Sequence, residues 1–172
     1  MIREVLSDVI DPALDRLVSY GIRVSDNARV MLLAIGLQES LLTHRFQISV
    51  RSDGSRFRGP ARGLWQFESG GGVAGVMNHR SSTDTARLFA TEFVGSHDNR
   101  AIWASLAYED ILAAIFARLL LWTDPLPLPA PIAASEQFAW QYYIRNWRPG
   151  KPWPDKWPGN WQAALDAVQK RN

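Results

Sequence analysis

The fold is decided by residues 25–40, SDNARVMLLAIGLQES, a segment that predicts one long helix with apolar residues on nearly every side. Ser25 supplies the side-chain oxygen of an N-cap, and Asp26 places a negative charge in the first turn, where the helix dipole favours it. Because the run from Val30 to Leu37 leaves no polar face, we expect this helix to be central and buried. Its polar side chains come together at its end, as Gln38, Glu39 and Ser40.

The residues after this helix change to the period of a β-strand. Phe46, Ile48 and Val50 alternate with polar residues, which is the pattern of a strand. Residues 52–55, SDGS, have the composition of a turn, after which the chain can return through Phe57. We therefore expect a small β-hairpin directly after the buried helix.

Most of the remaining chain has helical periodicity. Asp11 followed by Pro12 predicts an N-cap and a first helical residue, in a helix that runs to about Tyr20 and stops at Gly21. Prolines at positions 125, 127, 129 and 131 predict an extended surface connection. Further helices are expected at residues 73–79, 83–94, 108–122, 135–147 and 160–170.

Together these patterns predict a mainly α (α+β) single domain over residues 1–172. We expect N-terminal helices (1–24), a core (26–150), and a C-terminal strap and helix (151–172). This length is sufficient for one hydrophobic core. The composition, with 47% hydrophobic and 21% charged residues, is typical of a globular protein rather than a disordered one.

The composition also excludes several kinds of chemistry. Without cysteine, neither disulfides nor thiol catalysis is available. No apolar run approaches the ~20 residues that a membrane span needs, and the N-terminus lacks the layout of a signal peptide. The 3 histidines lack the spacing of metal ligands, and no glycine loop has a phosphate-binding pattern. We therefore expect a monomer that has no membrane span, no metal and no cofactor.

The positive charge is concentrated in one stretch, residues 44–62. Five arginines there face a single acid, Asp53, so the stretch carries a formal charge of +4 (five minus one). A basic face of this kind favours polyanions such as nucleic acid, bacterial envelope polymers or phospholipid. The alternative is a solvated loop that is basic without binding anything.

Glu39 is the first candidate for chemistry. A carboxylate at the end of an apolar helix is partly desolvated, and desolvation raises its pKa because the charged form is disfavoured. A general acid needs such a raised pKa to hold its proton near neutral pH. The alternative is a surface carboxylate at a frayed helix end.

Gln66 is the second candidate, within residues 63–67, GLWQF. Its amide offers donors and an acceptor between apolar neighbours, and such a group can bind an N-acetyl or hydroxyl group of a sugar. In the alternative interpretation, Leu64, Trp65 and Phe67 plug the core while Gln66 points outward.

Together these two segments resemble the lysozyme-like superfamily, most closely the soluble lytic transglycosylases and goose-type lysozymes. In that family a helix ends in Glu-Ser, a short β region follows, and a Gly-Leu-Met-Gln segment comes next. The matching residues here are Gln38-Glu39-Ser40 and residues 61–66, ARGLWQ, and a later Tyr-Asn motif corresponds to Tyr143 and Asn146. The resemblance covers about residues 26–150, and extends to lysozyme-like proteins of tailed phages and prophages.

The resemblance implies a lysozyme-like fold and cleavage of the β-1,4 bond between N-acetylmuramic acid and N-acetylglucosamine in bacterial cell-wall peptidoglycan. Glu39 would be the general acid and base, and the substrate would be bound by Ser40, Gln66, Tyr143 and Asn146. The chain departs from the family in its arginine-rich insertion after Glu39 and in Trp65, which replaces Met. Without a signal peptide, the protein would reach the wall in a phage particle or through cell lysis.

A second carboxylate would decide the reaction, because two-acid glycosidases place one carboxyl group on either side of the scissile bond. Asp53 is the best candidate, although an aspartate beside Gly54 is also an ordinary turn residue. Glu68 is the other candidate. If neither faces Glu39, the resemblance implies a one-acid mechanism in which the substrate's own N-acetyl or C6 hydroxyl group attacks, the latter giving a 1,6-anhydro product.

The C-terminal stretch WRPGKPWPDKWPGNW, residues 147–161, is rich in tryptophan. Its indoles either stack on sugar rings or form a strap that covers the core. Two rival functions remain open: a non-catalytic phage structural or internal protein of the same fold, and a nucleic-acid-binding module that uses the arginine-rich stretch. No helix-turn-helix or aromatic platform motif favours the second rival, so no nucleic-acid partner is expected.

Overall fold

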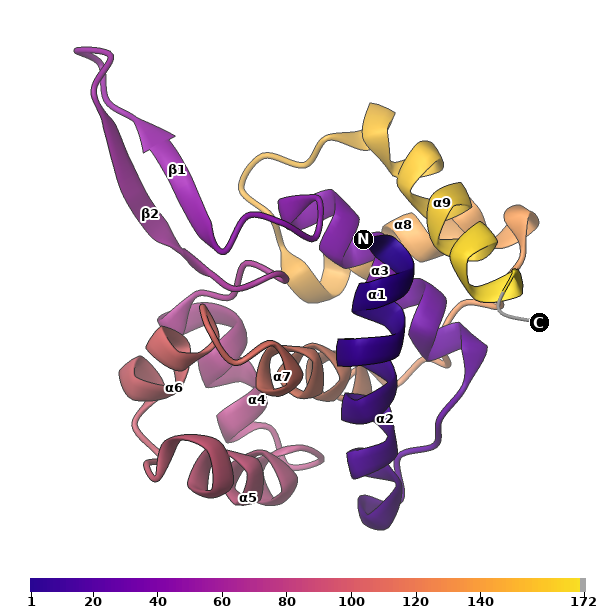
Figure 1. Ribbon diagram of the computed structural model, residues 1–172, viewed down its shortest axis with the longest axis horizontal. Helices are drawn as coiled ribbons and strands as arrows, with labels where there is room; N and C mark the ends of the chain where they lie inside the picture. Colours follow the sequence, from indigo (N-terminus) through magenta and orange to yellow (C-terminus); the bar gives the residue numbers. More distant parts are fainter. Residues whose placement is uncertain (171–172) are drawn as a thin grey trace.

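The computed structural model describes residues 1–170, which form a mainly helical protein with one two-stranded antiparallel sheet, as predicted (Figure 1). The strands are β1 (Phe46–Val50) and β2 (Arg56–Arg62). The helices are α1 (Ile2–Val5), α2 (Asp11–Leu17), α3 (Asp26–Ser40), α4 (Ala74–Asn78), α5 (Thr83–Val94), α6 (Asn99–Ser105), α7 (Asp110–Trp122), α8 (Glu136–Trp147) and α9 (Trp157–Gln169).

Helix α3 is the buried helix that the sequence predicts. The Ser25 hydroxyl accepts a hydrogen bond from the Ala28 N–H at 3.2 Å, so the predicted N-cap is confirmed. Every residue from Val30 to Leu37 is buried. Helix α9 packs along α3, and α7 contacts it from another direction. The apolar side chains of these three helices belong to one core cluster.

The N-terminal helix begins earlier than predicted. The N-cap prediction at Asp11 is wrong, because helical structure starts at Ile2 and continues to Tyr20. Residues 6–10 form a wider π-helical turn, which ends two residues before Pro12. A wider turn accommodates the proline ring and its missing N–H, which an α-helical turn cannot do without a kink. Gly21 ends the helix in the left-handed conformation (φ 79°), as expected.

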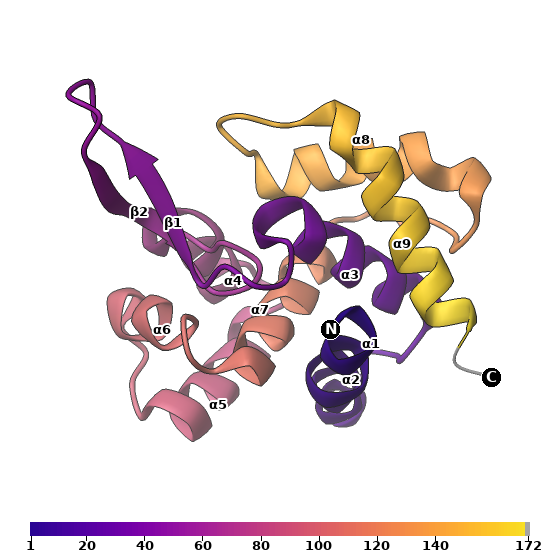
Figure 2. The same cartoon turned by 45° about the horizontal axis from the view of Figure 1, so that its top comes forward.

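The predicted hairpin is confirmed, and it projects away from the helices (Figures 1 and 2). Ile48 lies opposite Arg58 and Val50 opposite Arg56. The turn closes with a hydrogen bond from the Gly54 N–H to the Arg51 carbonyl, with Gly54 at φ 83°. Ile48 and Val50 remain 56% and 62% exposed, so the apolar side chains that revealed the strand are not buried in the core.

Helix α6 was not predicted, and α9 begins three residues earlier than the expected position 160. Asp98 caps α6 by accepting a hydrogen bond from the Ala101 N–H at 2.8 Å. In α9, Pro158 lies in the first turn, where a missing N–H costs nothing. The expected helix at 83–94 matches α5. No helix among residues 1–170 is long and apolar enough to cross a membrane.

Gly63 and Gly54 allow a matched test of the turn that follows β2. Both have positive φ, but a Cβ at Gly63 would lie 2.3 Å from the Leu106 carbonyl oxygen, whereas a Cβ at Gly54 would meet nothing within 4 Å. We predict that Gly63→Ala lowers the free energy of unfolding by about 2–4 kcal/mol, since the collision adds to the backbone strain. Gly54→Ala should cost about 1 kcal/mol. Equal losses in denaturant titrations would show that Gly63 does not approach Leu106 as described.

Candidate active site

Glu39 lies in the last turn of α3, where it lines a cavity of about 1310 Å³. The Tyr143 hydroxyl, from α8, donates a hydrogen bond to Glu39 Oε1 at 2.6 Å. Tyr143 is itself only 2% exposed, so the hydrogen bond is shielded from water on the α8 side. The bond leaves Oε2 as the carboxylate oxygen available to a ligand in the cavity.

Burial raises the pKa of Glu39 to about 7. The Tyr143 hydrogen bond acts in the opposite direction and lowers it, while the negative charge of Glu68 raises it further. Burial also raises the pKa of Tyr143 well above that of an ordinary tyrosine, with the Glu39 charge adding to the effect. Tyr143 therefore stays a hydrogen-bond donor at every physiological pH, and Glu39 exchanges its proton near neutrality.

Ser40 was expected to bind substrate, but the structure places it on the inner side of the α3 terminus. Its residue exposure is 3%, and it does not line the cavity. Its hydroxyl donates to the Leu64 carbonyl at 2.6 Å and accepts from the Leu42 N–H at 3.1 Å. Leu41 and Leu42 both have left-handed φ values, 56° and 55°. Ser40 thus holds a strained turn beside Glu39, and its hydroxyl, whose proton is donated inside the protein, does not face the ligand cavity.

In residues 63–67, GLWQF, the structure shows both a core plug and a glutamine that lines the cavity. Leu64, Trp65 and Phe67 are at most 2% exposed and fill the core. The Trp65 indole N–H donates to the Leu32 carbonyl in the middle of α3, at 2.9 Å. Gln66 instead lines the cavity, with a left-handed φ of 51°. The buried neighbours therefore fix the backbone that presents Gln66.

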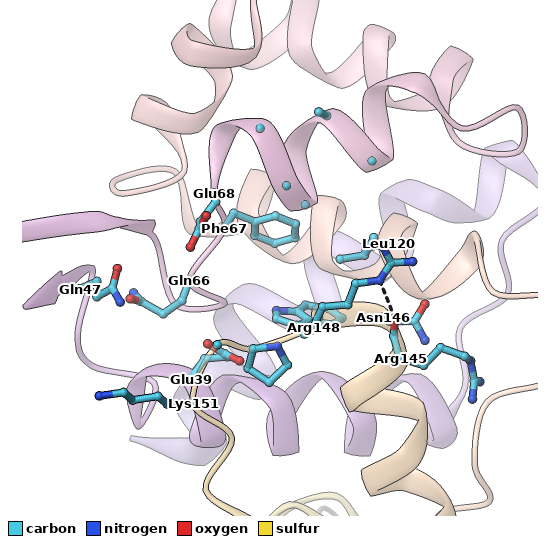
Figure 3. Close-up of a pocket in the computed structure, with 18 of the residues that line it drawn as sticks. Glu39, Gln47, Gln66, Phe67, Glu68, Leu120, Arg145, Asn146, Arg148 and Lys151 are labelled. Carbon is cyan, nitrogen blue, oxygen red and sulfur yellow. Dashed lines mark hydrogen bonds between the residues drawn. The ribbon is translucent and has the colours of Figure 1, made fainter. Parts of the chain in front are cut away.

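The amide nitrogen of Gln66 donates to the carbonyls of Gly63 and His44, at 2.8 and 3.1 Å. These bonds orient the side chain and leave its oxygen as the atom that can accept a hydrogen bond from a ligand. Figure 3 shows Gln66 between Glu39 and Glu68 in the cavity.

The structure does not bring Asp53 to Glu39. Asp53 is exposed at the hairpin turn, where its carboxylate accepts a hydrogen bond from the Ser55 N–H at 2.8 Å, and it does not line the cavity. Bonds from Ser55 lower its pKa, so it behaves as the ordinary turn aspartate. Glu68 does line the cavity, on the side opposite Glu39 (Figure 3). Glu68 is therefore the carboxylate that can act together with Glu39.

Helix α8 brings the later candidates to the same place. Tyr143 donates its hydrogen bond to Glu39 without lining the cavity itself, and Asn146 lines the cavity. The Asn146 amide nitrogen donates to Asp124 Oδ2 at 2.7 Å and to the Tyr142 carbonyl at 2.8 Å. Its oxygen remains for a ligand, so the expected binding role is compatible with its position.

The C-terminal tryptophans divide between the two interpretations. Trp157 and Trp161 are each 1% exposed and cover the core, and Trp157 stacks on Tyr143 with ring centroids 5.2 Å apart. Trp153 is 58% exposed and lines the cavity. The strap thus supports Tyr143 from behind and offers one indole to a ligand.

Several cavity residues escaped the sequence analysis, among them Gln47 on β1 and Arg148 and Lys151 after α8. Exposed polar residues of these types are common, and their sequence carries no signal that they face Glu39. Among the described residues, no cluster of three side chains of the types that bind metal ions occurs. Comparisons with models of protein families, with curated proteins and with solved structures found no match.

The raised pKa of Glu39 predicts a specific dependence of stability on pH. Folding raises this pKa from 4.5 to about 7, so the folded protein binds the proton more tightly. The stability that the folded protein gains by binding this proton at Glu39 is fully present below about pH 4.5 and is lost as pH rises through 7. Glu39→Gln should therefore raise the free energy of unfolding by about 2 kcal/mol at pH ~8.5, with a much smaller change at pH ~5.

Urea denaturation of both proteins at the two pH values makes this measurement. The glutamine oxygen can still accept the Tyr143 hydrogen bond, so the variant removes the charge and little else. A difference between the two proteins that is the same at both pH values would contradict the raised pKa.

Proposed function

We propose that the protein is a peptidoglycan-cleaving glycosidase with Glu39 as its general acid and base. The observation that carries the proposal is the Glu39 carboxyl group, which faces a large cavity with a pKa of about 7. A cavity of this size accommodates several sugar rings, and the amide oxygens of Gln66 and Asn146 and the exposed Trp153 are groups that bind amino sugars.

The bond to be cleaved is the β-1,4 linkage between N-acetylmuramic acid and N-acetylglucosamine. Protonated Glu39 donates its proton from Oε2 to the glycosidic oxygen as the C–O bond breaks, which neutralises the leaving alkoxide. The Tyr143 hydrogen bond to Oε1 stabilises the carboxylate that results. Glu39 then takes a proton from the attacking nucleophile and returns to its starting state.

Glu68 is the proposed second carboxylate. Its charge already raises the pKa of Glu39, and it lines the opposite side of the cavity (Figure 3). In that position it can orient a water molecule toward the anomeric carbon, which would make the enzyme a hydrolase. It takes the role that the sequence analysis gave to Asp53.

We predict that Glu39→Gln lowers the rate of peptidoglycan cleavage roughly 10²–10⁴-fold, because the amide cannot donate the proton. Tyr143→Phe should keep measurable activity and move the alkaline limb of the pH–rate profile to higher pH. The Tyr143 hydrogen bond lowers the pKa of Glu39, so removing the bond raises that pKa. The loss of turbidity of a suspension of purified sacculi measures the cleavage rate of both variants.

Tyr142→Phe is the matched control for Tyr143→Phe. The Tyr142 hydroxyl donates to the carbonyls of Leu121 and Leu126, away from Glu39, so the variant should leave the alkaline limb where it is. Wild-type activity in Glu39→Gln would end the catalytic assignment.

The Glu68→Gln variant tests the reaction type. We expect wild-type digests to contain muropeptides with free reducing ends, and the variant to lose roughly 10²-fold or more in rate. Its residual alkaline limb should lie at lower pH, because one negative charge near Glu39 is gone. Mass spectrometry that finds 1,6-anhydro products from the wild type would show that Glu68 holds no attacking water and that the enzyme is a lytic transglycosylase.

A further inference from the structure

The hairpin carries a row of exposed apolar side chains on one face of its sheet. Phe46, Ile48 and Val50 alternate along β1, so their side chains point to the same side. Ile48 and Val50 are more than half exposed. Tyr108, which follows α6, is 69% exposed and meets the Phe46 ring with the centroids 5.9 Å apart. A contiguous apolar row on a projecting element marks an interaction surface, whereas single exposed apolar residues do not.

Arginines form a second row beside the apolar one. Side chains that lie directly opposite each other on antiparallel strands share a face of the sheet. Arg58 is opposite Ile48, and Arg56 is opposite Val50. The Arg58 guanidinium lies over the Phe46 ring, 4.1 Å from its centroid, as a shared face requires. Neither arginine has an ion-pair partner within residues 1–170. We call this surface the hairpin face; its members are Phe46, Ile48, Val50, Arg56, Arg58 and Tyr108.

Two unpaired guanidinium groups favour an anionic occupant, and a nucleic acid is one candidate. Single-stranded nucleic acids bind by stacking successive bases on open aromatic rings. On the hairpin, arginines occupy the ring faces: Arg58 lies over Phe46, and Arg51 lies over Phe57 at 4.5 Å. Tyr108 is the one open ring of the hairpin face, so this surface lacks a platform for successive bases.

The exposed aliphatic side chains of Ile48 and Val50 separate the remaining candidates. Duplex nucleic acid and the phosphodiester polymers of bacterial envelopes would bind the arginines and leave these two side chains in water, without the gain from burying them. A phospholipid surface offers both kinds of partner, because its phosphates lie directly outside an apolar phase. Tyrosine is also favoured at that boundary, where its ring and its hydroxyl meet different environments. The hairpin face therefore fits an anionic membrane surface.

We propose that the hairpin face binds the surface of membranes that contain anionic phospholipids. The arginines contact the phosphates, while the aliphatic side chains and Tyr108 enter the boundary between headgroups and acyl chains. The hairpin projects away from the helices, which leaves it free to lie on an extended surface (Figures 1 and 2). Ile48 and Val50 also border the cavity that contains Glu39, so membrane attachment places that cavity beside the bilayer. The inference goes beyond the proposed function and does not depend on it.

Sedimentation with mixed vesicles of phosphatidylglycerol and phosphatidylcholine measures the binding. The pair Ile48→Thr and Val50→Thr keeps both positions β-branched, as a strand favours, and reduces the apolar surface. We expect it to bind the mixed vesicles roughly tenfold more weakly than the wild type. The pair Arg56→Gln and Arg58→Gln should bind them about thirtyfold more weakly, because each basic residue at an anionic surface contributes about fivefold. Wild-type protein should bind vesicles of phosphatidylcholine alone much more weakly.

Matched pairs outside the hairpin control for a general loss of charge or of apolar surface. Arg3→Gln with Arg23→Gln removes two exposed positive charges. Val18→Thr with Leu88→Gln replaces two apolar side chains that are more than half exposed. Both pairs should bind the mixed vesicles as the wild type does. Circular dichroism checks that every variant is folded, which we expect because none of the substituted side chains belongs to the buried core.

A threonine pair that binds the mixed vesicles as tightly as the wild type would overturn the inference and assign the arginines to the phosphates of a polymer. Absence of binding by the wild type, or equal binding to vesicles with and without phosphatidylglycerol, would overturn it as well. None of these results concerns cleavage, because the vesicles contain no glycan. Wild-type protein that cleaves sacculi and ignores vesicles would remove the membrane site alone, and protein that binds vesicles and cleaves nothing would remove only the catalytic proposal.

Discussion

The hydrogen bond between the Tyr143 hydroxyl and the Glu39 carboxylate joins the end of α3 to α8, across 104 residues of sequence. The desolvation of this carboxylate depends on the burial of α3, in which every residue from Val30 to Leu37 is buried. The hydrogen bond also requires α8 to be held in place, which Trp157 does by stacking on Tyr143. The contact also bears on the cavity, because Glu39 and the residues that follow Tyr143 at the end of α8 line it together.

The surroundings of Glu39 explain how one carboxylate can both release and accept a proton near neutral pH. Burial alone would stabilise the acid form, and the Tyr143 hydrogen bond alone would stabilise the carboxylate. Their opposition, with the Glu68 charge added, leaves the pKa at about 7. Asp53 shows the contrasting case: an exposed carboxylate that accepts a backbone N–H has its pKa lowered and cannot serve as an acid at that pH.

Local sequence patterns correctly predicted those structural elements that form because of a few neighbouring residues. The Ser25 cap, the buried run of α3 and the glycine of the hairpin turn each depend on a few adjacent residues, and all three were confirmed. The start of the N-terminal helix was missed because a π-helical turn before Pro12 relieves the steric rule on which the prediction relied. Helix α6 was missed because its seven residues are too few for a clear period.

The candidate site was predictable to the extent that its residues are adjacent in sequence to a buried element. Glu39 and Gln66 follow buried segments, and both line the cavity. Ser40 adjoins Glu39 but faces inward, because one residue along a helix turns a side chain by about 100°. The choice between Asp53 and Glu68 depends on how far the hairpin projects, which is set by packing at its base and cannot be derived from the pattern of its strands.

The central claim is that folding places the Glu39 carboxyl group in an environment where it titrates near neutrality. The most direct measurement is a ¹³C NMR titration of the glutamate side-chain carboxyl groups, with the Glu39 resonance assigned by its absence in Glu39→Gln. A midpoint at about pH 7 is the predicted result. A midpoint near 4.5, the value of an ordinary glutamate, would contradict the account, because Glu39 would then be ionised at neutral pH and unable to act as a general acid.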